Sequence, residues 1–178
     1  MRPIETARLV LEPLVVAHAE QMFEVLNESL LYRFLDNPPP PSIEHLRGVY
    51  SRLESRASPS GSQLWLNWAL IPRGKSAIGY VQATIIAGEA AWVAYLLASK
   101  AWGRGYATEA MQGMLAHLAI SYDVVVCRAT VEAENQASIH LLERLAFNRA
   151  SAQDLEDHVL SPTERLFVKH LRGEQNVL

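Results

Sequence analysis

The second half of the chain places the tightest constraint on the fold, because two strand-like segments flank a helix-like one. An apolar run at residues 92–98 leads into the glycine-rich turn 103–108, an apolar helical face follows, and a second apolar run covers 124–131. Parallel neighbours in one sheet need a crossover of about a dozen residues or more, which is usually a helix. The segment therefore predicts a strand–helix–strand unit with parallel strands and a right-handed crossover.

The remaining segments extend this unit into a mixed sheet. A first strand is expected at 8–12, followed by helical patterns at 16–27, at 30–35 and, after four consecutive prolines, from Ser42 onward. Three strand-like runs joined by short turns predict an antiparallel meander, and a further helix and strand follow the crossover. The three meander strands are expected at 64–71, 78–86 and 92–98, the further helix at 138–145 and the last strand at 164–171. We expect an α/β fold in the broad sense, with α+β character and a mixed central sheet. The chain is expected to form one domain over 1–178, in which residues 173–178 fray.

The composition excludes several classes of protein. The 178 residues fit one domain, and their formal net charge of −3 lacks the basic excess typical of a nucleic-acid binder. The one cysteine, Cys127, rules out an internal disulfide, and the six histidines show no paired metal-ligand spacing. No apolar run reaches the about 18 residues of a membrane span, and the first residues lack the apolar core of a secretory signal. We therefore expect a cytoplasmic protein that binds no nucleic acid, no membrane and no metal.

The glycine-rich turn has the chemistry of an anion site. Glycine permits positive φ and close backbone approach, and the first N–H groups of the following helix have no partner within the helix. These groups favour a phosphate, and Arg104 adds a positive charge. The alternative is a plain strand-to-helix turn. An NAD-dependent oxidoreductase fits poorly, because Thr108 stands where a dinucleotide-binding turn has its third glycine, and no lysine follows the glycines as a P-loop requires.

A second polar cluster follows the run 124–131. Asn135 can cap the next helix, and Ser138 lies in its first turn. Because the carboxyl ends of parallel strands meet at one edge of a sheet, both helix N-termini face the same end, where ligands of such sheets bind. We expect the glycine-rich turn and this cluster to share one cleft. The alternative is an ordinary helix cap with a solvated serine.

Three ordered motifs resemble the GNAT N-acetyltransferase superfamily and, within it, the RimJ/RimL-like branch. ETARLVL at 5–11 is similar to the opening strand of the branch, WGRGYATEA at 102–110 to its pyrophosphate loop, and NQASIHLLERLAF at 135–147 to its last helix. The branch usually ends this helix with Gly-Phe, whereas Ala146 and Phe147 stand here. The resemblance implies a GNAT-like acyl-CoA N-acyltransferase fold whose two parallel strands splay apart, with acetyl-CoA as cosubstrate and a primary amine as acceptor.

The resemblance also implies where acetyl-CoA binds. The pantetheine arm would lie along the strand near Leu96 and Leu97, and Asn135 would contact this arm or the splayed strand. A backbone N–H beside the thioester would stabilise the negative charge that develops on its oxygen. The pyrophosphate would bind the loop that comprises Gly103, Arg104, Gly105, Tyr106, Ala107 and Thr108.

Acetyl transfer to an amine needs a proton acceptor and is helped by a proton donor. Many members of the superfamily place a donor tyrosine in the last helix, but Leu142 stands at that position, so Ser138 or a water is the expected donor. Trp92 occupies the place of the usual basic glutamate, and Glu132 at the end of the second parallel strand is the first candidate base. These two catalytic assignments, Ser138 and Glu132, are implied by the resemblance and by strand position.

The resemblance further implies that the acceptor site lies beneath the first helices and the proline segment. Tyr32, Asp36 and Trp92 are the candidate substrate contacts, because aromatic rings suit an apolar or flat acceptor and a carboxylate suits a cationic amine. Asp36 and His45 are also alternative bases. The expected acceptor is a protein N-terminus or a small-molecule amine, and the expected state is a monomer or homodimer. The alternative function is a non-catalytic acyl-CoA-binding sensor on the same fold, which the missing tyrosine favours.

Overall fold

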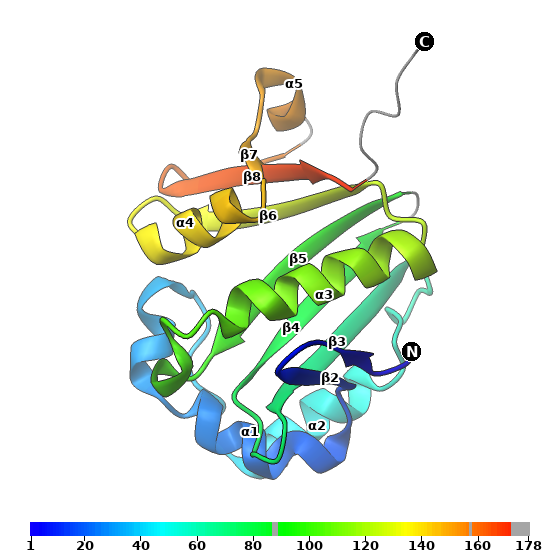
Figure 1. Ribbon diagram of the computed structural model, residues 1–178, viewed down its shortest axis with the longest axis vertical. Helices are drawn as coiled ribbons and strands as arrows, with labels where there is room; N and C mark the ends of the chain where they lie inside the picture. The colour runs from blue at the N-terminus through cyan, green and yellow to red at the C-terminus, as the bar shows by residue number, and fades with distance from the viewer. Residues whose placement is uncertain (87–88, 157, 172–178) are drawn as a thin grey trace.

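An eight-stranded mixed sheet forms the centre of the molecule, in the spatial order β1-β2-β3-β4-β5-β6-β8-β7 (Figure 1). The structure is a computed structural model that describes residues 1–86, 89–156 and 158–171, so the tail expected to fray, 173–178, lies outside the described residues. β5 and β6 run parallel, and the other neighbouring strands pair antiparallel, which confirms the expected fold class. The strands are β1 (Ile4–Glu5), β2 (Leu9–Pro13), β3 (Gln63–Pro72), β4 (Gly79–Ile86), β5 (Ala90–Leu97), β6 (Val126–Glu132), β7 (Asn148–Arg149) and β8 (Glu164–His170).

Two layers of helices cover the two faces of the sheet. One layer holds α3 (Tyr106–Ser121) and α4 (Gln136–Arg144), and the other holds α1 (Ala19–Leu26) and α2 (Ile43–Leu53). Successive strand residues point to opposite faces, so Trp68 of β3 is buried in the core that includes α3, and Ala69 in the core that includes α1 and α2. The shorter helices are η1 (Val16–His18), η2 (Ser29–Phe34), η3 (Ser99–Ala101) and α5 (Ala152–Leu155).

Local sequence signals set several of these boundaries. Ser42 begins α2, and its Oγ accepts a hydrogen bond from the N–H of His45 at 3.1 Å, as expected for a serine N-cap. The antiparallel meander and the helix after the glycine-rich turn are confirmed. β1, β7 and α5 are not among the expected elements, because segments of two to four residues are too short to show a hydrophobic period.

The two parallel strands separate soon after they meet. β5 and β6 pair only over three positions, from Ala90 with Val126 to Trp92 with Arg128. Beyond that point β5 stays paired with β4 up to Leu97, while β6 stays paired with β8 up to Glu132. Figure 1 shows the two strands diverging toward the end of the sheet at which α3 and α4 begin. The sheet therefore opens into a V at the carboxyl ends of its parallel strands.

Both outer edges of the sheet are very short strands. β1 and β7, the first and last strands in spatial order, have two residues each.

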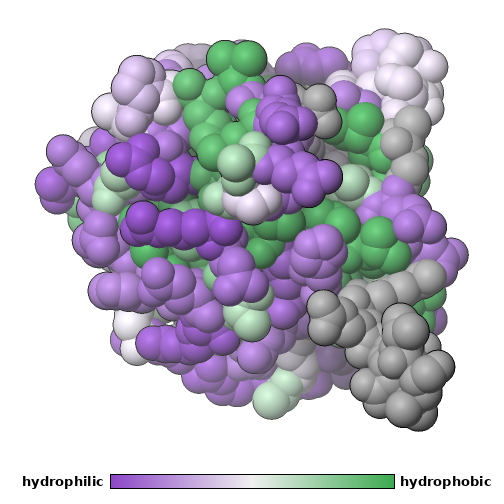
Figure 2. All heavy atoms as spheres, turned by 90° about the horizontal axis from the view of Figure 1, so that it is seen from above, coloured by the Kyte–Doolittle hydropathy of each residue, from purple (hydrophilic) through white to green (hydrophobic). Residues whose placement is uncertain are grey.

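The surface exposes some apolar side chains. Val159, between α5 and β8, is fully exposed, and Leu155 at the end of α5 is also exposed. From above, hydrophobic residues show between hydrophilic ones over much of the molecule (Figure 2). Among the described residues, no helix combines the length and apolar character needed to cross a membrane.

Candidate active site

The glycine-rich loop exposes the N-terminal end of α3 at the mouth of the V. Gly103 and Gly105 adopt φ angles of 69° and 75°, in the left-handed region that glycine enters without strain. Gly105 is the N-cap residue, and the first helical hydrogen bond runs from the N–H of Glu109 to its carbonyl at 3.1 Å. The N–H groups of Tyr106 and Thr108 precede this bond and have no partner within the helix. The predicted loop therefore has the geometry of an anion site at a helix N-terminus.

Two side chains fix the segment that leads from β5 into this loop. The indole Nε1 of Trp102 donates to the carbonyl of Leu97 at 2.8 Å. The carboxylate of Glu28, just before η2, accepts hydrogen bonds from the main chain and the hydroxyl of Ser99, and these bonds hold the pKa of Glu28 below its ordinary value. The Leu97 carbonyl therefore already has a donor, and the Leu96 carbonyl points toward Gly79 of β4 rather than into the V.

A tyrosine that the sequence does not single out connects β5, one arm of the V, to the helix that follows β6, the other arm. The hydroxyl of Tyr95, on β5, donates to Ser138 Oγ, on α4, at 2.9 Å. Burial raises the pKa of Tyr95, and the hydrogen bond to Ser138 only partly opposes that effect. The phenol is therefore protonated near neutral pH and can act as a donor. The signal is invisible in the sequence because the two residues lie 43 positions apart on different elements.

Asn135 and Ser138 lie together at the start of α4, as expected. Asn135 Oδ1 accepts a hydrogen bond from the N–H of Ser138 at 3.2 Å, so Asn135 is the helix cap. Glu132 ends β6 and is half-buried, with its backbone paired to Glu164 of β8. Its neighbour Val131 is buried in the core that includes α3 and α4, so by strand alternation Glu132 points to the opposite face. The candidate base and the candidate donor thus flank the V from different faces of the sheet.

The three expected acceptor contacts lie on separate elements. Trp92 is on β5 where the V begins, with its ring edge-on to His158 at a centroid distance of 5.1 Å. Tyr32, in η2, donates its hydroxyl to the carbonyl of Leu26 at 2.7 Å, and burial raises its pKa. Asp36, between η2 and α2, is exposed. Of the three, Trp92 borders the V directly, on the same face as Glu132 by strand alternation.

Cys127 is a poor nucleophile in this structure. Cys127, near the start of β6, is completely buried, and burial raises the pKa of the thiol to about 12. A reactive cysteine needs a low pKa and access to solvent, and Cys127 has neither. Within the described ranges, no three or more His, Cys, Asp or Glu side chains lie close enough to hold one metal ion.

A family comparison assigns most of the chain. The family model described as "Acetyltransferase (GNAT) domain" matches residues 8–148, which contain the glycine-rich loop, β5, β6 and α4. No curated protein matches the chain in sequence.

Solved structures share the architecture at low sequence identity. A GNAT-family acetyltransferase from Bacillus anthracis is 17% identical with a TM-score of 0.75, over 95% of this chain and 98% of its own. RimL, a ribosomal protein alpha-N-acetyltransferase solved with coenzyme A, is 17% identical with a TM-score of 0.77, over 94% and 97%. The microcin C7 self-immunity acetyltransferase MccE, solved with acetyl-CoA and AMP, is 14% identical with a TM-score of 0.71, over 92% and 93%. At these identities the likeness shows the fold.

Proposed function

Because the chain belongs to the GNAT acetyltransferase family, we propose that it transfers the acetyl group of acetyl-CoA directly to a primary amine. The observation that carries the proposal is the V between β5 and β6, with the N-terminus of α3 at its mouth. A V lined by strand backbone suits an extended pantetheine arm, and a free helix N-terminus suits a diphosphate. In the proposed enzyme, residues 1–178 form one catalytic domain, which acts as a monomer or homodimer.

The residues at the mouth of the V fit a CoA diphosphate. Gly103 has open space where a Cβ would stand, so the backbone is free to approach a ligand. Arg104, within the loop, is exposed and supplies a positive charge. In the proposed complex, the N–H groups of 104–108 bind the diphosphate, Leu96 and Leu97 lie beside the pantetheine arm, and Asn135 contacts that arm across the V. Acetyl-CoA would supply the activated acetyl thioester.

Tyr95 and Ser138 form a hydrogen-bonded pair that can deliver a proton into the V. The Ser138 hydroxyl accepts from Tyr95, so its own proton is free to point toward another acceptor. We assign Ser138 as the donor to the departing sulfur, with Tyr95 behind it as the group that orients the hydroxyl. A thiolate is a good leaving group, with a pKa of about 8.5 for a free cysteine, so this donation contributes modestly to the rate.

Glu132 and Trp92 belong to the acceptor side of the proposal. Both lie on the face of the sheet opposite the donor pair, so an amine on that face would approach the thioester from the side away from Ser138. Glu132 would take the proton from the attacking amine, directly or through a water. Tyr32 and Asp36 remain proposed acceptor contacts, and the acceptor itself is a protein N-terminus or a small-molecule amine.

A non-catalytic acyl-CoA-binding sensor is the second candidate. Leu142, at the position of the usual donor tyrosine, is 2% exposed and fills the core, so it offers no chemistry. The donor pair of Tyr95 and Ser138 weighs against the sensor, because it places hydroxyls in the V by another route.

Two measurements test the proposal in order. Thermal unfolding with acetyl-CoA, CoA and NAD should show stabilisation by both CoA species and none by NAD, because a ligand at a hundred times its Kd adds about 2.7 kcal/mol. Release of free thiol is then followed with short peptides bearing different N-terminal residues and with small amines. Turnover with an amine supports the enzyme, and binding without turnover supports the sensor. Absence of any shift with CoA and acetyl-CoA contradicts both.

If turnover is found, Tyr95→Phe and Ser138→Ala separate the donor pair from the fold. We expect kcat to fall in Ser138→Ala by no more than about a hundredfold, the low end for general acid catalysis, and by less in Tyr95→Phe, with the Kd for CoA unchanged. Unchanged kcat in both variants would leave water as the donor.

A further inference from the structure

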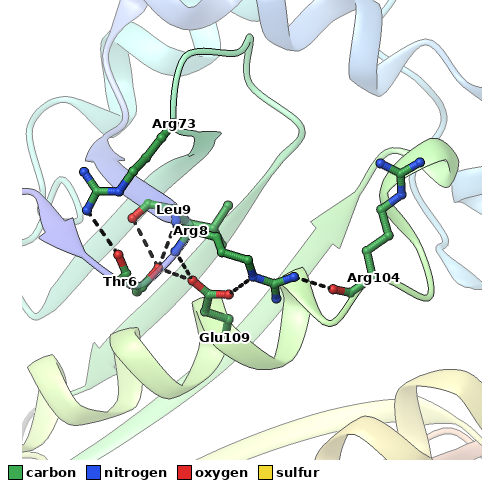
Figure 3. Close-up of polar contacts among 6 residues, drawn as sticks. All are labelled: Thr6, Arg8, Leu9, Arg73, Arg104 and Glu109. Atoms are coloured by element: carbon green, nitrogen blue, oxygen red, sulfur yellow. Dashed lines mark hydrogen bonds and ion pairs between the residues drawn. The ribbon is translucent and has the colours of Figure 1, made fainter.

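The pyrophosphate loop is tied to the beginning of the chain by a small polar cluster. Glu109, in the first turn of α3, accepts hydrogen bonds from Thr6 Oγ1 at 2.6 Å, from the Arg8 N–H at 2.7 Å and from Arg8 Nε at 2.6 Å. The same guanidinium donates through Nη1 to the carbonyl of Arg104 at 2.9 Å. Figure 3 shows this bridge, in which Arg8 lies between Glu109 and the loop while the guanidinium of Arg104 points away. Arg8 therefore joins the loop to the helix that follows it.

Arg8 also lies against the residues that begin α3. Its guanidinium carbon is 4.6 Å from the centre of the Tyr106 ring, in cation–π contact. A Cβ added to Gly105 would lie 3.3 Å from Arg8 Nη2, so even the smallest side chain would crowd the guanidinium. The side chain of Arg8 is 48% exposed, whereas that of Glu109 is 16% exposed. The cation thus stands at the surface of the loop and the carboxylate lies beneath it.

Glu109 places a negative charge in the first turn of α3, beside the loop that would bind a diphosphate. A carboxylate in the first turn of a helix interacts favourably with the helix dipole, and so it competes with any other anion bound there. Burial works to raise the pKa of Glu109, but the hydrogen bonds from Thr6 and Arg8 and the charge of Arg8 outweigh it and keep the group ionised. Without Arg8, a diphosphate at the loop would face this negative charge at close range.

We propose that Arg8 is a positioning residue for the diphosphate site, which holds the loop through the Arg104 carbonyl and offsets the charge of Glu109. This inference rests on the proposed function, because it assumes that the loop binds the diphosphate of CoA. The opening segment of the chain thus takes part in cosubstrate binding, although Arg8 lies 96 positions before Arg104 in the sequence.

The test compares Arg8→Met, Glu109→Gln and the double variant with Arg73→Met as a matched control. Arg73 is a neighbouring cation of similar exposure, 53%, whose guanidinium donates to Glu5 at 3.1 Å and to the Thr6 carbonyl at 3.2 Å rather than to the loop. The Kd of CoA is measured for each folded variant, together with that of acetylpantetheine, which lacks the diphosphate. Hydrogen exchange of the loop amides 104–108 is followed without ligand.

We expect Arg8→Met to weaken CoA binding about tenfold, which corresponds to about 1.4 kcal/mol, and to leave acetylpantetheine binding unchanged. Exchange should rise at 104–108 in Arg8→Met and remain as in the wild type in Arg73→Met. The double variant should bind CoA more tightly than Arg8→Met, because it lacks the uncompensated carboxylate. A role that is merely structural predicts the opposite order, since two contacts are then lost.

The outcomes separate this inference from the proposal beneath it. If the wild-type chain binds no CoA, the proposed function fails and the role of Arg8 in CoA binding fails with it. If the wild type binds CoA and Arg8→Met binds it equally well, the positioning role alone is overturned. If the double variant binds CoA more weakly than Arg8→Met does, Arg8 does not act by offsetting the charge of Glu109. Its role in holding the loop is then decided by the hydrogen exchange of amides 104–108.

Discussion

Replacing Ala146 by glycine should stabilise the protein, because Ala146, the residue after the C-cap Leu145 of α4, adopts a conformation that favours glycine. Its φ of 58° lies in the left-handed region. The N–H of Ala146 donates to the carbonyl of Glu143 and the N–H of Phe147 to that of Leu142, each at 2.9 Å, which is the Schellman pattern of helix ends. Phe147 and Leu142 are each 2% exposed, so this turn fixes an aromatic ring in the core. The helix stop is thus retained although glycine is missing.

The expected gain is a difference between two backbone effects. A left-handed conformation costs a non-glycine residue about 1–2 kcal/mol, and glycine removes this cost. Glycine also increases the entropy of the unfolded chain, which lowers the stability of the folded state by about 0.4–1 kcal/mol. Ala146 is exposed, so removing its methyl group gives up little burial. The net stabilisation is therefore about 0.5–1 kcal/mol, which in a chain of this size raises the Tm by about 1–4 °C.

Denaturant and thermal unfolding measure this gain against a control that makes the same chemical change. Ala116 is exposed within α3, away from its ends, and there glycine should cost about 0.5–1 kcal/mol. The two substitutions should thus shift the unfolding midpoint in opposite directions at equal m-value. A loss of stability in Ala146→Gly as large as in Ala116→Gly would refute the backbone argument for this turn.

Three further expectations follow from single residues. Gly79→Ala should lower the free energy of unfolding by about 1–3 kcal/mol, because the added Cβ would lie 2.1 Å from the Leu96 carbonyl oxygen. Gly48→Ala in α2 is the control in urea unfolding, because a Cβ there meets nothing within 4 Å. Cys127 should resist a thiol reagent at pH 8 in the native protein and react on denaturation, since the pKa of its buried thiol is raised to about 12; rapid labelling of the native state would contradict this. Glu109 has a pKa below its ordinary value of 4.5. Its ionised form therefore stabilises the protein above pH 4.5, and this stabilisation is lost as the pH falls through the lowered pKa. Glu109→Gln should flatten the acid limb of a plot of unfolding free energy against pH.

Short-range chemistry in the sequence predicts much of this fold. The glycine-rich turn, the Ser42 cap and the Asn135 cap each act within a few residues of themselves, and each starts the helix that it predicts. The parallel crossover follows from the spacing of two apolar runs, and it places the two helix N-termini at one end of the sheet. The general location of the site is therefore predictable from local patterns alone.

Long-range pairs are not predictable in that way. Tyr95 is one of several aromatic residues in an apolar strand, and only the fold brings it to Ser138. Arg8 and Glu109 are 101 positions apart, and each has an ordinary local explanation as a surface residue or a helix-dipole partner. The turn at Ala146 is not predictable from its residue type, because alanine there adopts a left-handed conformation next to a buried Phe147.

The two-residue strands at the sheet edges bear on how the protein behaves in a crowded solution. An exposed strand edge is a template on which another chain can add a strand, and long apolar edges lead to fibrils. Behind β1 lies β2, whose Leu9 and Leu11 are completely buried, and beside β7 lies β8 with an equally buried Phe167. Each edge strand is too short to template a partner, yet it covers part of a strand that could. A truncation that removes β1 would uncover such an edge and turn a self-contained sheet into a surface for self-association.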